Sequence, residues 1–385
     1  MEISVPSILA CSFSLTILTC ILYIILKKDQ FISKIGIFTV YLIGIFIIVR
    51  SCLPFDFYYF HLTHTFFSDD FLPFLQNIGR ITIDPLQNND KYQITISTLI
   101  LFVWFSVAGI LFVMKLAGFI SYQIKLCKIY SPSSPQVSRI FSDALQTVFP
   151  KTSPNCTLIK LNTISTPASF GIIHHYILLP DIDFSEKELY CIFVHELLHI
   201  KNHDVAFKLL LDLSLVIHWW NIFIFKFLPG LLHHVQELYV DYWVSHYISK
   251  EEKACYLSGI HKTLKYTQKY MSKNVSAGTL CTFSSNKQII QRFSFILNPC
   301  TRYRSLPAII TMVFLFVLSF SYVIEPFNLP DYDENGENVF YMNDNNSFFI
   351  FNNGSYDLYV DGEYMGNLKE IPDTFMDLPV YSNPK

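Results

Sequence analysis

The sequence predicts a polytopic α-helical membrane protein with about four spans, a larger α+β domain on the cytoplasmic side and a small extracellular β-rich tail. Three observations lead to this prediction. The 385 residues are 51% hydrophobic and 15% charged, whereas soluble domains carry about 25% charged residues. Four apolar runs are long enough to cross, or nearly cross, a bilayer. Between the third and fourth runs lies a long segment with mixed helix and strand patterns.

The first two apolar runs predict a pair of spans near the N-terminus. Residues 5–26 carry no charge, and 22 helical residues at about 1.5 Å each cover the roughly 30 Å of hydrocarbon in a bilayer. No basic residue precedes this run and no small-residue cleavage pattern follows it, so we expect a retained anchor rather than a signal peptide. Residues 35–49 form a shorter second span, which Lys34 and Arg50 can lengthen by snorkelling.

Two further runs predict the third and fourth spans. Residues 94–114 are uncharged and end at Lys115. Residues 306–324 are uncharged and follow Arg302 and Arg304. The chain is therefore expected to divide into four parts: an N-terminal membrane domain (1–117), an internal domain (118–303), a fourth span (306–324) and a tail (325–385).

Basic residues close to the span ends predict the orientation, because Lys and Arg resist translocation far more than acidic residues do. They gather after the first span, after the third and before the fourth, at Lys27, Lys28, Lys34, Lys115, Lys125, Lys128, Arg302 and Arg304. After residue 324 no basic residue occurs until Lys369. We therefore expect a multi-pass protein of the cell membrane, with both termini and the loop 51–92 outside and the internal domain in the cytoplasm. Arg50, on the external side, is a mild exception.

The charge balance and the cysteines exclude two classes of function. The formal net charge is −3 and the chain has no long basic run, so nucleic acid is not expected as a direct ligand. No two of the nine cysteines form a C-x-x-C pair, and several lie in apolar runs. They are interpreted as reduced thiols rather than as a disulfide framework or a thiolate zinc site.

The internal domain shows helical, strand and again helical patterns. Residues 135–149 place apolar residues at helical spacing after the breaker SPSSP. Residues 156–180 are rich in β-branched and aromatic residues and predict two or three short strands. From Ser185 the pattern is helical. Residues 213–225 carry no acid or base but are too few for a span, so they predict a buried or interface-lying helix.

An H-E-x-x-H motif lies in this helical region, at His195, Glu196 and His199. Residues four apart on a helix share one face, so both imidazoles can reach one metal ion at about 2.0–2.1 Å. Glu196 can address the remaining coordination position and take a proton from a zinc-activated water. The alternative is a chance match, which is expected roughly 0.01 times in a chain of this composition.

A second helical segment offers a third ligand. In QELYVDYW, Glu237 and Asp241 lie four residues apart. Catalytic zinc usually has three protein ligands and one open position, so Glu237 would complete the set and Asp241 could accept the second ring N–H of a liganding histidine. Such a carboxylate pair is more often a solvated helix face, but the apolar residues around it weaken that alternative.

Together the two motifs resemble the membrane zinc metallopeptidases of the BlaR/MecR antirepressor type, in which an H-E-x-x-H helix is followed by an E-x-x-x-D helix. Five further segments are similar to that family: SFGIIHHYILLP (169–180), FSEKELYCIFVHE (184–196), HWWN (218–221), SKEEKACY (249–256) and FSSNKQIIQR (283–292). The similarity covers residues 1 to about 325. The sequence departs from the pattern at Ile222, where the family usually has proline, and at Tyr242, where an acid is common.

The resemblance implies a gluzincin-like α+β metalloprotease domain of the zincin type, in a bacterial membrane protein that holds one Zn²⁺ per chain. It also implies roles by position. The zinc ligands would be His195, His199 and Glu237, and the general base would be Glu196. Asp241 and Asp204 would be the two acids that orient the ligands.

Other residues are candidates for handling the substrate. His218, beside two tryptophans, is interpreted as a core or interfacial histidine, with hydrogen bonding to a tetrahedral oxyanion as the alternative. Residues 169–179 are the candidate sheet edge, and Ser169, Phe170 and Gly171 in it could pair with an extended peptide. By resemblance, Thr282, Phe283 and Ser284 lie in a candidate self-cleavage loop.

The tail predicts a small β-structure. FFIFNNGSYDLYV alternates about an Asn-Asn-Gly turn, and VDGEYMG contains an Asp-Gly hairpin turn. The tail is acidic and could bind a cation, a cationic peptide or another subunit, with an unspecialised cap as the alternative. Residues 325–385 are far fewer than the penicillin-binding domain of family members that detect β-lactams, so β-lactam sensing is not expected.

The leading interpretation is a signal-transducing zinc metalloendopeptidase of the antirepressor type, which hydrolyses a peptide bond in a cytoplasmic regulator or in itself. Its expected partners are membrane lipid and a peptide or protein substrate, with a cytoplasmic transcriptional repressor and a homo-oligomer as candidates. Two alternatives stay open: a housekeeping quality-control protease of membrane proteins, and a non-catalytic membrane receptor. The intact motif residues disfavour the receptor.

Overall fold

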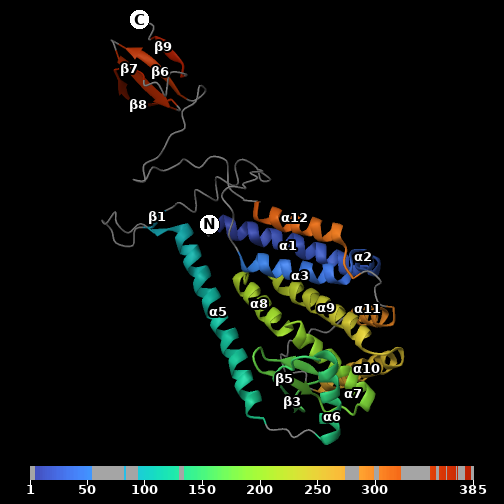
Figure 1. Cartoon of the computed structure of the whole chain (residues 1–385). Helices are drawn as coiled ribbons and strands as arrows, with labels where there is room; N and C mark the ends of the chain where they lie inside the picture. The colour runs from blue at the N-terminus through green and yellow to red at the C-terminus, as the bar shows by residue number, and fades with distance from the viewer. Residues whose placement is uncertain are drawn as a thin grey trace. The chain divides into compact units, whose positions relative to one another are not determined.

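A computed structural model of the chain describes residues 5–53, 82–83, 94–129, 134–273, 286–298, 303–321, 347–352, 355–360, 362–369, 371 and 378–382 (Figure 1). The chain divides into two compact units, residues 1–325 and 326–385, and each is described by itself. The first unit holds the apolar helices and an α+β region, and the second holds a small sheet. A helix-rich chain with some sheet is thus observed, in agreement with the predicted class.

Apolar helices near both ends of the first unit correspond to the predicted spans. They are α1 (Val5–Lys27), α2 (Asp29–Ile35), α3 (Ile37–Cys52), α5 (Ile96–Cys127) and α12 (Leu306–Ser321). Within the described ranges, α1 and α5 are long and apolar enough to cross a membrane, and α2 with α3 would be a third span if the bent pair is counted as one. Of about four expected spans, two or three are therefore supported, because the 16 residues of α12 are too few for the usual span of about 20.

The second predicted span contains a sharp bend. Helices α2 and α3 meet at an angle of 93° at Gly36, whose φ of +91° lies in the region that favours glycine. A Cβ atom at this position would lie 2.8 Å from the carbonyl oxygen of Tyr303, so the close approach of the segment before α12 also requires glycine. The straight part of this span therefore begins only at Ile37.

The third predicted span continues well past the apolar run. Thr95 caps α5, since its side chain accepts a hydrogen bond from the backbone N–H of Thr98. The helix then passes Lys115 without a break and has 32 residues, a length of about 48 Å. Because the hydrocarbon of a bilayer is only about 30 Å thick, one end of α5 must extend beyond it. Before α5, the short strands β1 (Thr82–Ile83) and β2 (Ile94–Thr95) pair antiparallel.

The apolar residues 213–225 do not form one helix, so the prediction of a single helix there is wrong. They belong to α8 (Asp204–Ile217) and α9 (Ile222–Tyr247), which are joined by the turn 218–221. The side chain of Asn221 accepts a hydrogen bond from the backbone N–H of Ile224 at 3.1 Å, and this cap begins a new helix. We call the two helices the α8–α9 hairpin, the turn 218–221 its tip, and the opposite end, with Asp204 and Glu237, its base.

The α8–α9 hairpin packs against the apolar helices α1 and α3 (Figure 1). Side chains from these four helices share one buried apolar core, which includes Leu15, Ile47, Leu215 and Leu228. The helix α8 is 14 residues long, which is about 21 Å, so the hairpin extends along most of the length of the predicted spans. It therefore connects the membrane helices with the α+β region.

The α+β region contains a three-stranded sheet, as the pattern of residues 156–180 predicts. The strands β3 (Cys156–Lys160), β4 (Ala168–Phe170) and β5 (His175–Leu179) lie in the order β3-β5-β4, with β3 parallel and β4 antiparallel to β5. The candidate edge 169–179 is corrected by this order: β4 is an edge strand, but β5 is the central strand because it pairs on both sides.

Four helices complete this region. They are α6 (Pro135–Val148), α7 (Glu186–Lys201), α10 (Lys250–Lys273) and α11 (Asn286–Leu297). Helix α6 confirms the amphipathic helix predicted at 135–149. Helix α7 starts with a capping box in which the Ser185 hydroxyl accepts from the Glu188 N–H and the Glu188 carboxylate accepts from the Ser185 N–H. Every residue of α7 from 191 to 200 is buried, and the helix packs against α6, α9 and α10, which fixes its orientation.

The second unit is a four-stranded sheet, which confirms the β-structure predicted for the tail. The strands β6 (Ser347–Asn352), β7 (Ser355–Val360), β8 (Glu363–Leu368) and β9 (Val380–Ser382) lie in the order β8-β7-β6-β9. The predicted Asp-Gly hairpin joins β7 and β8, where Val360 pairs with Glu363 and Gly362 has a φ of +84°.

Candidate metal centre

One side of helix α7 carries the H-E-x-x-H residues into the interior. His195, Glu196 and His199 are 8%, 5% and 6% exposed, although all three are polar. Buried polar groups of this kind need partners, because an unpaired one costs about 1–3 kcal/mol. The apolar residues that surround them on α7 pack on α6 and α10, so the motif faces the base of the α8–α9 hairpin.

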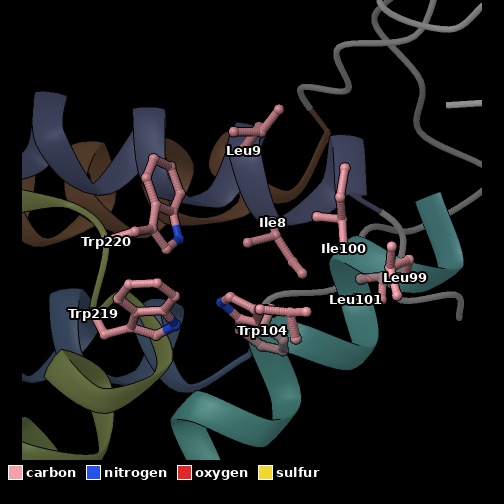
Figure 2. A pocket seen from close by; sticks show the side chains of 9 residues that line it. Ile8, Leu9, Leu99, Ile100, Leu101, Trp104, Trp219 and Trp220 are labelled. Carbon is pink, nitrogen blue, oxygen red and sulfur yellow. The ribbon is translucent and has the colours of Figure 1, made fainter. Parts of the chain in front are cut away.

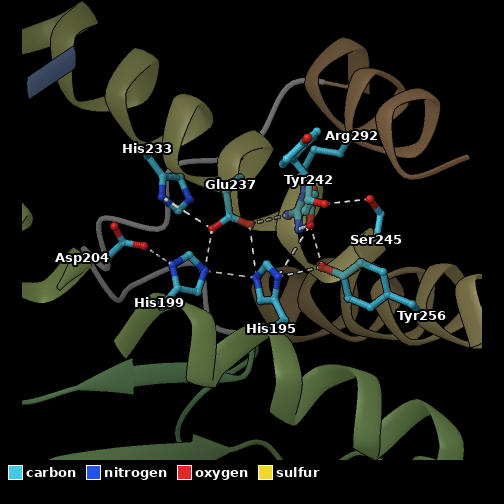
Figure 3. Close-up of polar contacts among 10 residues, drawn as sticks. His195, His199, Asp204, His233, Glu237, Tyr242, Ser245, Tyr256 and Arg292 are labelled. Atoms are coloured by element: carbon cyan, nitrogen blue, oxygen red, sulfur yellow. Dashed lines mark hydrogen bonds and ion pairs between the residues drawn. The ribbon is translucent and has the colours of Figure 1, made fainter. Parts of the chain in front are cut away.

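Two imidazoles and one carboxylate converge at this place (Figure 3). The Nε2 atoms of His195 and His199 lie 3.1 Å apart. Glu237, on α9, places Oε2 at 3.6 Å from Nε2 of His195 and Oε1 at 3.6 Å from Nε2 of His199. One ligand atom from each residue lies within 4.8 Å of the other two, and all three residues are buried.

This donor set fits a zinc ion. Tetrahedral ligands at about 2.0–2.1 Å from zinc lie about 3.4 Å from one another, close to the separations of 3.1 and 3.6 Å. The two Nε2 atoms face each other, which is unfavourable for two lone pairs unless a cation or a proton lies between them. Two histidines and one carboxylate are also one of the sets that hold catalytic zinc with a position left open.

His199 is oriented from behind by the first residue of α8. Its Nδ1 atom lies 2.5 Å from Oδ2 of Asp204, which is 1% exposed, and Oδ1 of Asp204 accepts a hydrogen bond from the Gln236 side chain at 3.2 Å. Burial alone would lower the pKa of His199, but Asp204 and then Glu237 raise it above its ordinary value. With Nδ1–H donated to Asp204, the Nε2 atom presents its lone pair to the metal position.

His195 is oriented through a tyrosine. The hydroxyl of Tyr256, on α10, donates to Oδ1 of Asp241 at 2.5 Å and lies 2.7 Å from Nδ1 of His195. Nδ1 of His195 itself is 3.6 Å from Asp241, so the hydroxyl stands between the imidazole and the carboxylate. Burial, together with the charge of Asp241, raises the pKa of Tyr256 well above its ordinary value, and the phenol stays protonated.

An arginine holds the two carboxylates of α9 in place. Arg292, on α11, lies 2.7 Å from Oε2 of Glu237 and donates to both carboxylate oxygens of Asp241, at 2.7 and 3.0 Å (Figure 3). Its side chain is only 15% exposed. Burial would raise the pKa of Glu237, but the charge of Arg292 and the imidazole of His195 hold it well below its usual range. Glu237 is therefore ionised, as a metal ligand must be.

His233 lies one turn before Glu237 on α9, with its Nδ1 atom 3.9 Å from Oε1 of Glu237. Burial lowers the pKa of His233 to about 4, so the imidazole is neutral. It is less buried than His195 and His199 and lies on the side of the cluster away from Tyr256 (Figure 3).

The structure brings some of the predicted residues together and not others. His195, Glu196, His199, Asp204, Glu237 and Asp241 gather at the base of the α8–α9 hairpin. His218 is not among them: it lies at the tip, where its Nε2 atom is 3.2 Å from the carbonyl oxygen of Ser51, and it is not suited to stabilise an oxyanion at the metal.

The candidate substrate residues are placed differently. Ser169 and Phe170 belong to the edge strand β4, which contacts α7. Gly171 follows with a φ of +96°, and a Cβ atom there would lie 2.0 Å from the carbonyl oxygen of His174, so this turn requires glycine. The candidate self-cleavage residues Thr282, Phe283 and Ser284 lie outside the described residues.

Reasoning from the sequence missed Tyr256 and Arg292. Both close segments that resemble the family, SKEEKACY and FSSNKQIIQR, and this was the signal that could have pointed to them. Neither has a spacing that predicts a site, because each reaches the centre from its own helix, α10 or α11.

Comparisons with known proteins place the chain in one family. The model of the BlaR1 peptidase M56 family matches residues 8–296. The regulatory protein BlaR1 of Bacillus licheniformis is 31% identical over 158 residues, which are 40% of this chain and 26% of that protein. The methicillin resistance mecR1 proteins of Staphylococcus aureus and Staphylococcus epidermidis are 29% identical over 145 residues, which are 36% of this chain and 24% of theirs. The matched region thus spans about a quarter of the length of these relatives.

Proposed function

Because the chain belongs to the BlaR1 peptidase M56 family, we propose that it is a signal-transducing zinc metalloendopeptidase of the membrane, which hydrolyses a peptide bond in a cytoplasmic regulator or in its own chain. The observation that carries this proposal is the buried cluster of His195, His199 and Glu237, whose ligand atoms converge within 4.8 Å. A receptor without chemistry would have no use for three metal-binding groups held at zinc distances in the interior.

In the proposed centre, His195, His199 and Glu237 hold one Zn²⁺. When bound, zinc would polarise the carbonyl group of the substrate and lower the pKa of a nearby water towards neutrality. The protein's own contribution is to fix the three donor atoms and to leave one side open. Asp204 and Tyr256 keep the Nδ1 atoms of the two imidazoles occupied, so only the Nε2 lone pairs are available to the metal.

Glu196 is the proposed general base. It follows His195 directly on α7 and is 5% exposed, and its charge contributes to the raised pKa of His199, which supports this assignment. It takes a proton from the attacking water and then passes that proton to the leaving amine of the cleaved peptide. Arg292 holds Glu237 and Asp241 and thereby positions the ligand without touching the substrate.

The edge strand β4 is the proposed docking strand for the substrate. It pairs with β5 on one side only and contacts the zinc-binding helix α7. An extended peptide added to its free side would run past the motif helix, and backbone hydrogen bonds would hold it whatever its side chains. In the proposed orientation the α+β region is cytoplasmic, both termini are outside, and a transcriptional regulator or the segment around Phe283 would be the substrate.

The proposal is tested with the full chain in lipid nanodiscs, loaded with Zn²⁺ and mixed with a synthetic peptide library that is read by mass spectrometry. The wild-type protein should cleave members of the library, and Glu196→Gln should lower the rate by about 10²–10⁴-fold while keeping its zinc. Cleavage by Glu196→Gln at the wild-type rate would refute the assignment of the base. Absence of all cleavage by a zinc-loaded wild-type protein would favour a receptor.

A further inference from the structure

A cavity lies at the tip of the α8–α9 hairpin, at the other end of α8 from the metal centre (Figure 2). It has a volume of about 370 Å³, within the usual range of roughly 300–1,000 Å³ for small-molecule sites. Its walls come from the first turns of α1, with Ile8 and Leu9, from the first turns of α5, and from the indoles of Trp219 and Trp220. Every lining residue is hydrophobic, so the cavity offers a ligand no charge and no recognition of polar groups.

The surroundings of the cavity indicate which apolar ligand would reach it. Among the residues that the structure describes, α1 and α5 are the two helices that meet the length and hydropathy of a membrane span, and only 6% of the apolar window of α5 is buried within the protein. Leu9, Ile100 and Val103 at the cavity are 41%, 48% and 50% exposed, so it opens sideways. A cavity that opens between two membrane helices faces lipid hydrocarbon rather than water.

The position of the cavity along these helices also matters. Apart from the two indoles of the hairpin tip, its lining residues belong to the first turns of α1 and α5, near the ends of the two helices, where a bilayer changes from hydrocarbon to headgroups. Tryptophan is enriched at that level. Three of the four tryptophans of the chain line the cavity: Trp104, Trp219 and Trp220. A lipid with its headgroup at the membrane surface could therefore place one chain in the cavity.

Hydrogen bonds also connect the elements that form the wall of the cavity. The indole N–H of Trp104 donates to the carbonyl oxygen of Ile217, the last residue of α8, at 3.0 Å, which joins α5 to the hairpin. Asn221, in the tip, donates to the hydroxyls of Ser12 and Thr16 on α1, at 2.6 and 3.3 Å. The three walls are thus connected by hydrogen bonds, and the indoles of Trp104, Trp219 and Trp220 lie around the space between them (Figure 2).

We propose that this cavity is a binding site for one hydrocarbon chain of a membrane lipid, held between the start of α1, the start of α5 and the tip of the α8–α9 hairpin. The site differs from general contact with the bilayer, because it saturates when one chain is bound and depends on the shape of its walls. It does not depend on the metal centre or on any catalytic activity.

Tryptophan fluorescence tests the proposal. In a Trp243→Phe background, the remaining indoles are the three that line the cavity. The full chain is placed in phosphatidylcholine nanodiscs and dibromostearate, whose bromines quench indoles on contact, is added at rising mole fraction. We expect quenching that saturates and is reversed by an excess of unbrominated stearate. Both results are obtained without altering a residue of the cavity.

A matched pair of variants on α5 supplies the control. Val103→Phe fills the cavity, whereas Val113→Phe adds the same side chain to a lipid-facing position of the same helix, 63% exposed and outside the cavity. Val103→Phe should weaken the saturable quenching by about tenfold or abolish it, and Val113→Phe should leave it unchanged. Quenching that rises linearly with mole fraction and is equal in both variants would show bulk lipid contact only, and would overturn the proposal.

Discussion

The two ends of the α8–α9 hairpin both bury polar side chains, but they pair these side chains with different chemical groups. At the base, buried charged groups lie in pairs of opposite sign: Asp204 with His199, and Glu237 and Asp241 with Arg292. At the tip, the polar contacts are neutral: His218 meets a backbone carbonyl group of α3, and Asn221 meets two hydroxyls of α1. Because charge is costly inside a membrane, the hairpin brings no charge of its own to the tip, whereas its base gathers the charged groups that ion chemistry needs.

The largest difference between the two ends is expected when one buried histidine is removed from each of them. At the base, His199→Ala deletes a proposed zinc ligand and should lower the affinity for Zn²⁺ by at least about 100-fold, since each ligand carries a share of a binding free energy of about 10–16 kcal/mol in comparable sites. At the tip, His218→Ala should leave the zinc content unchanged. The measurement is zinc per chain in the purified protein, and an equal loss in both variants would remove the distinction.

Removing the buried arginine at the base should cost about 3–5 kcal/mol of stability, because Glu237 and Asp241 would be left as buried carboxylates without their partner. Arg292→Met is compared with Lys262→Met, which breaks a more exposed ion pair to Glu188 and should cost at most about 1 kcal/mol. Thermal unfolding in detergent provides the readout. Added Zn²⁺ should restore part of the loss in Arg292→Met, because it returns positive charge to Glu237. No difference between the variants would contradict the assigned role.

Two aspartates of the same helix, α8, are expected to differ in their effect on zinc binding. Asp204→Asn removes the charge behind His199 and should weaken zinc binding by about 10–100-fold. Asp212→Asn removes an exposed charge, paired with Lys115 of α5, and should change zinc binding by less than twofold. Competition with a zinc chelator distinguishes them. Equal affinities in the two variants would mean that Asp204 does not orient the ligand.

The smallest effect is expected at the tip. Asn221→Ala removes the cap of α9 and two hydrogen bonds to α1, and should lower the stability by about 1–2 kcal/mol without a change in zinc affinity. Unfolding and chelator competition on the same sample measure both quantities. A large change in zinc affinity would show that tip and base are coupled more tightly than the hydrogen bonds suggest.

Features that depend on residues close in the sequence could be predicted, whereas features that depend on contacts between distant residues could not. The spacing of His195 and His199 on one helix predicted that they share a face, and the structure brings their Nε2 atoms within 3.1 Å of each other, beside the carboxylate of Glu237. The bend at Gly36 was missed because it arises from the close approach of Tyr303, which lies more than 250 residues away in the sequence.

The hairpin tip shows the same limit. The run 213–225 is apolar on both sides of Asn221, so hydropathy gave no sign of a turn, and only the cap and the contacts with α1 reveal it. Arg292 and Tyr256 likewise became visible only when α10 and α11 were packed against α9.

X-ray absorption at the zinc edge tests the central claim most directly, with the full chain in nanodiscs. We predict one zinc per chain, two imidazole nitrogens and oxygen in its coordination shell, and loss of that signal in Glu237→Ala. A sulfur ligand from one of the nine cysteines, or a shell that Glu237→Ala leaves unchanged, would contradict the metal centre described above.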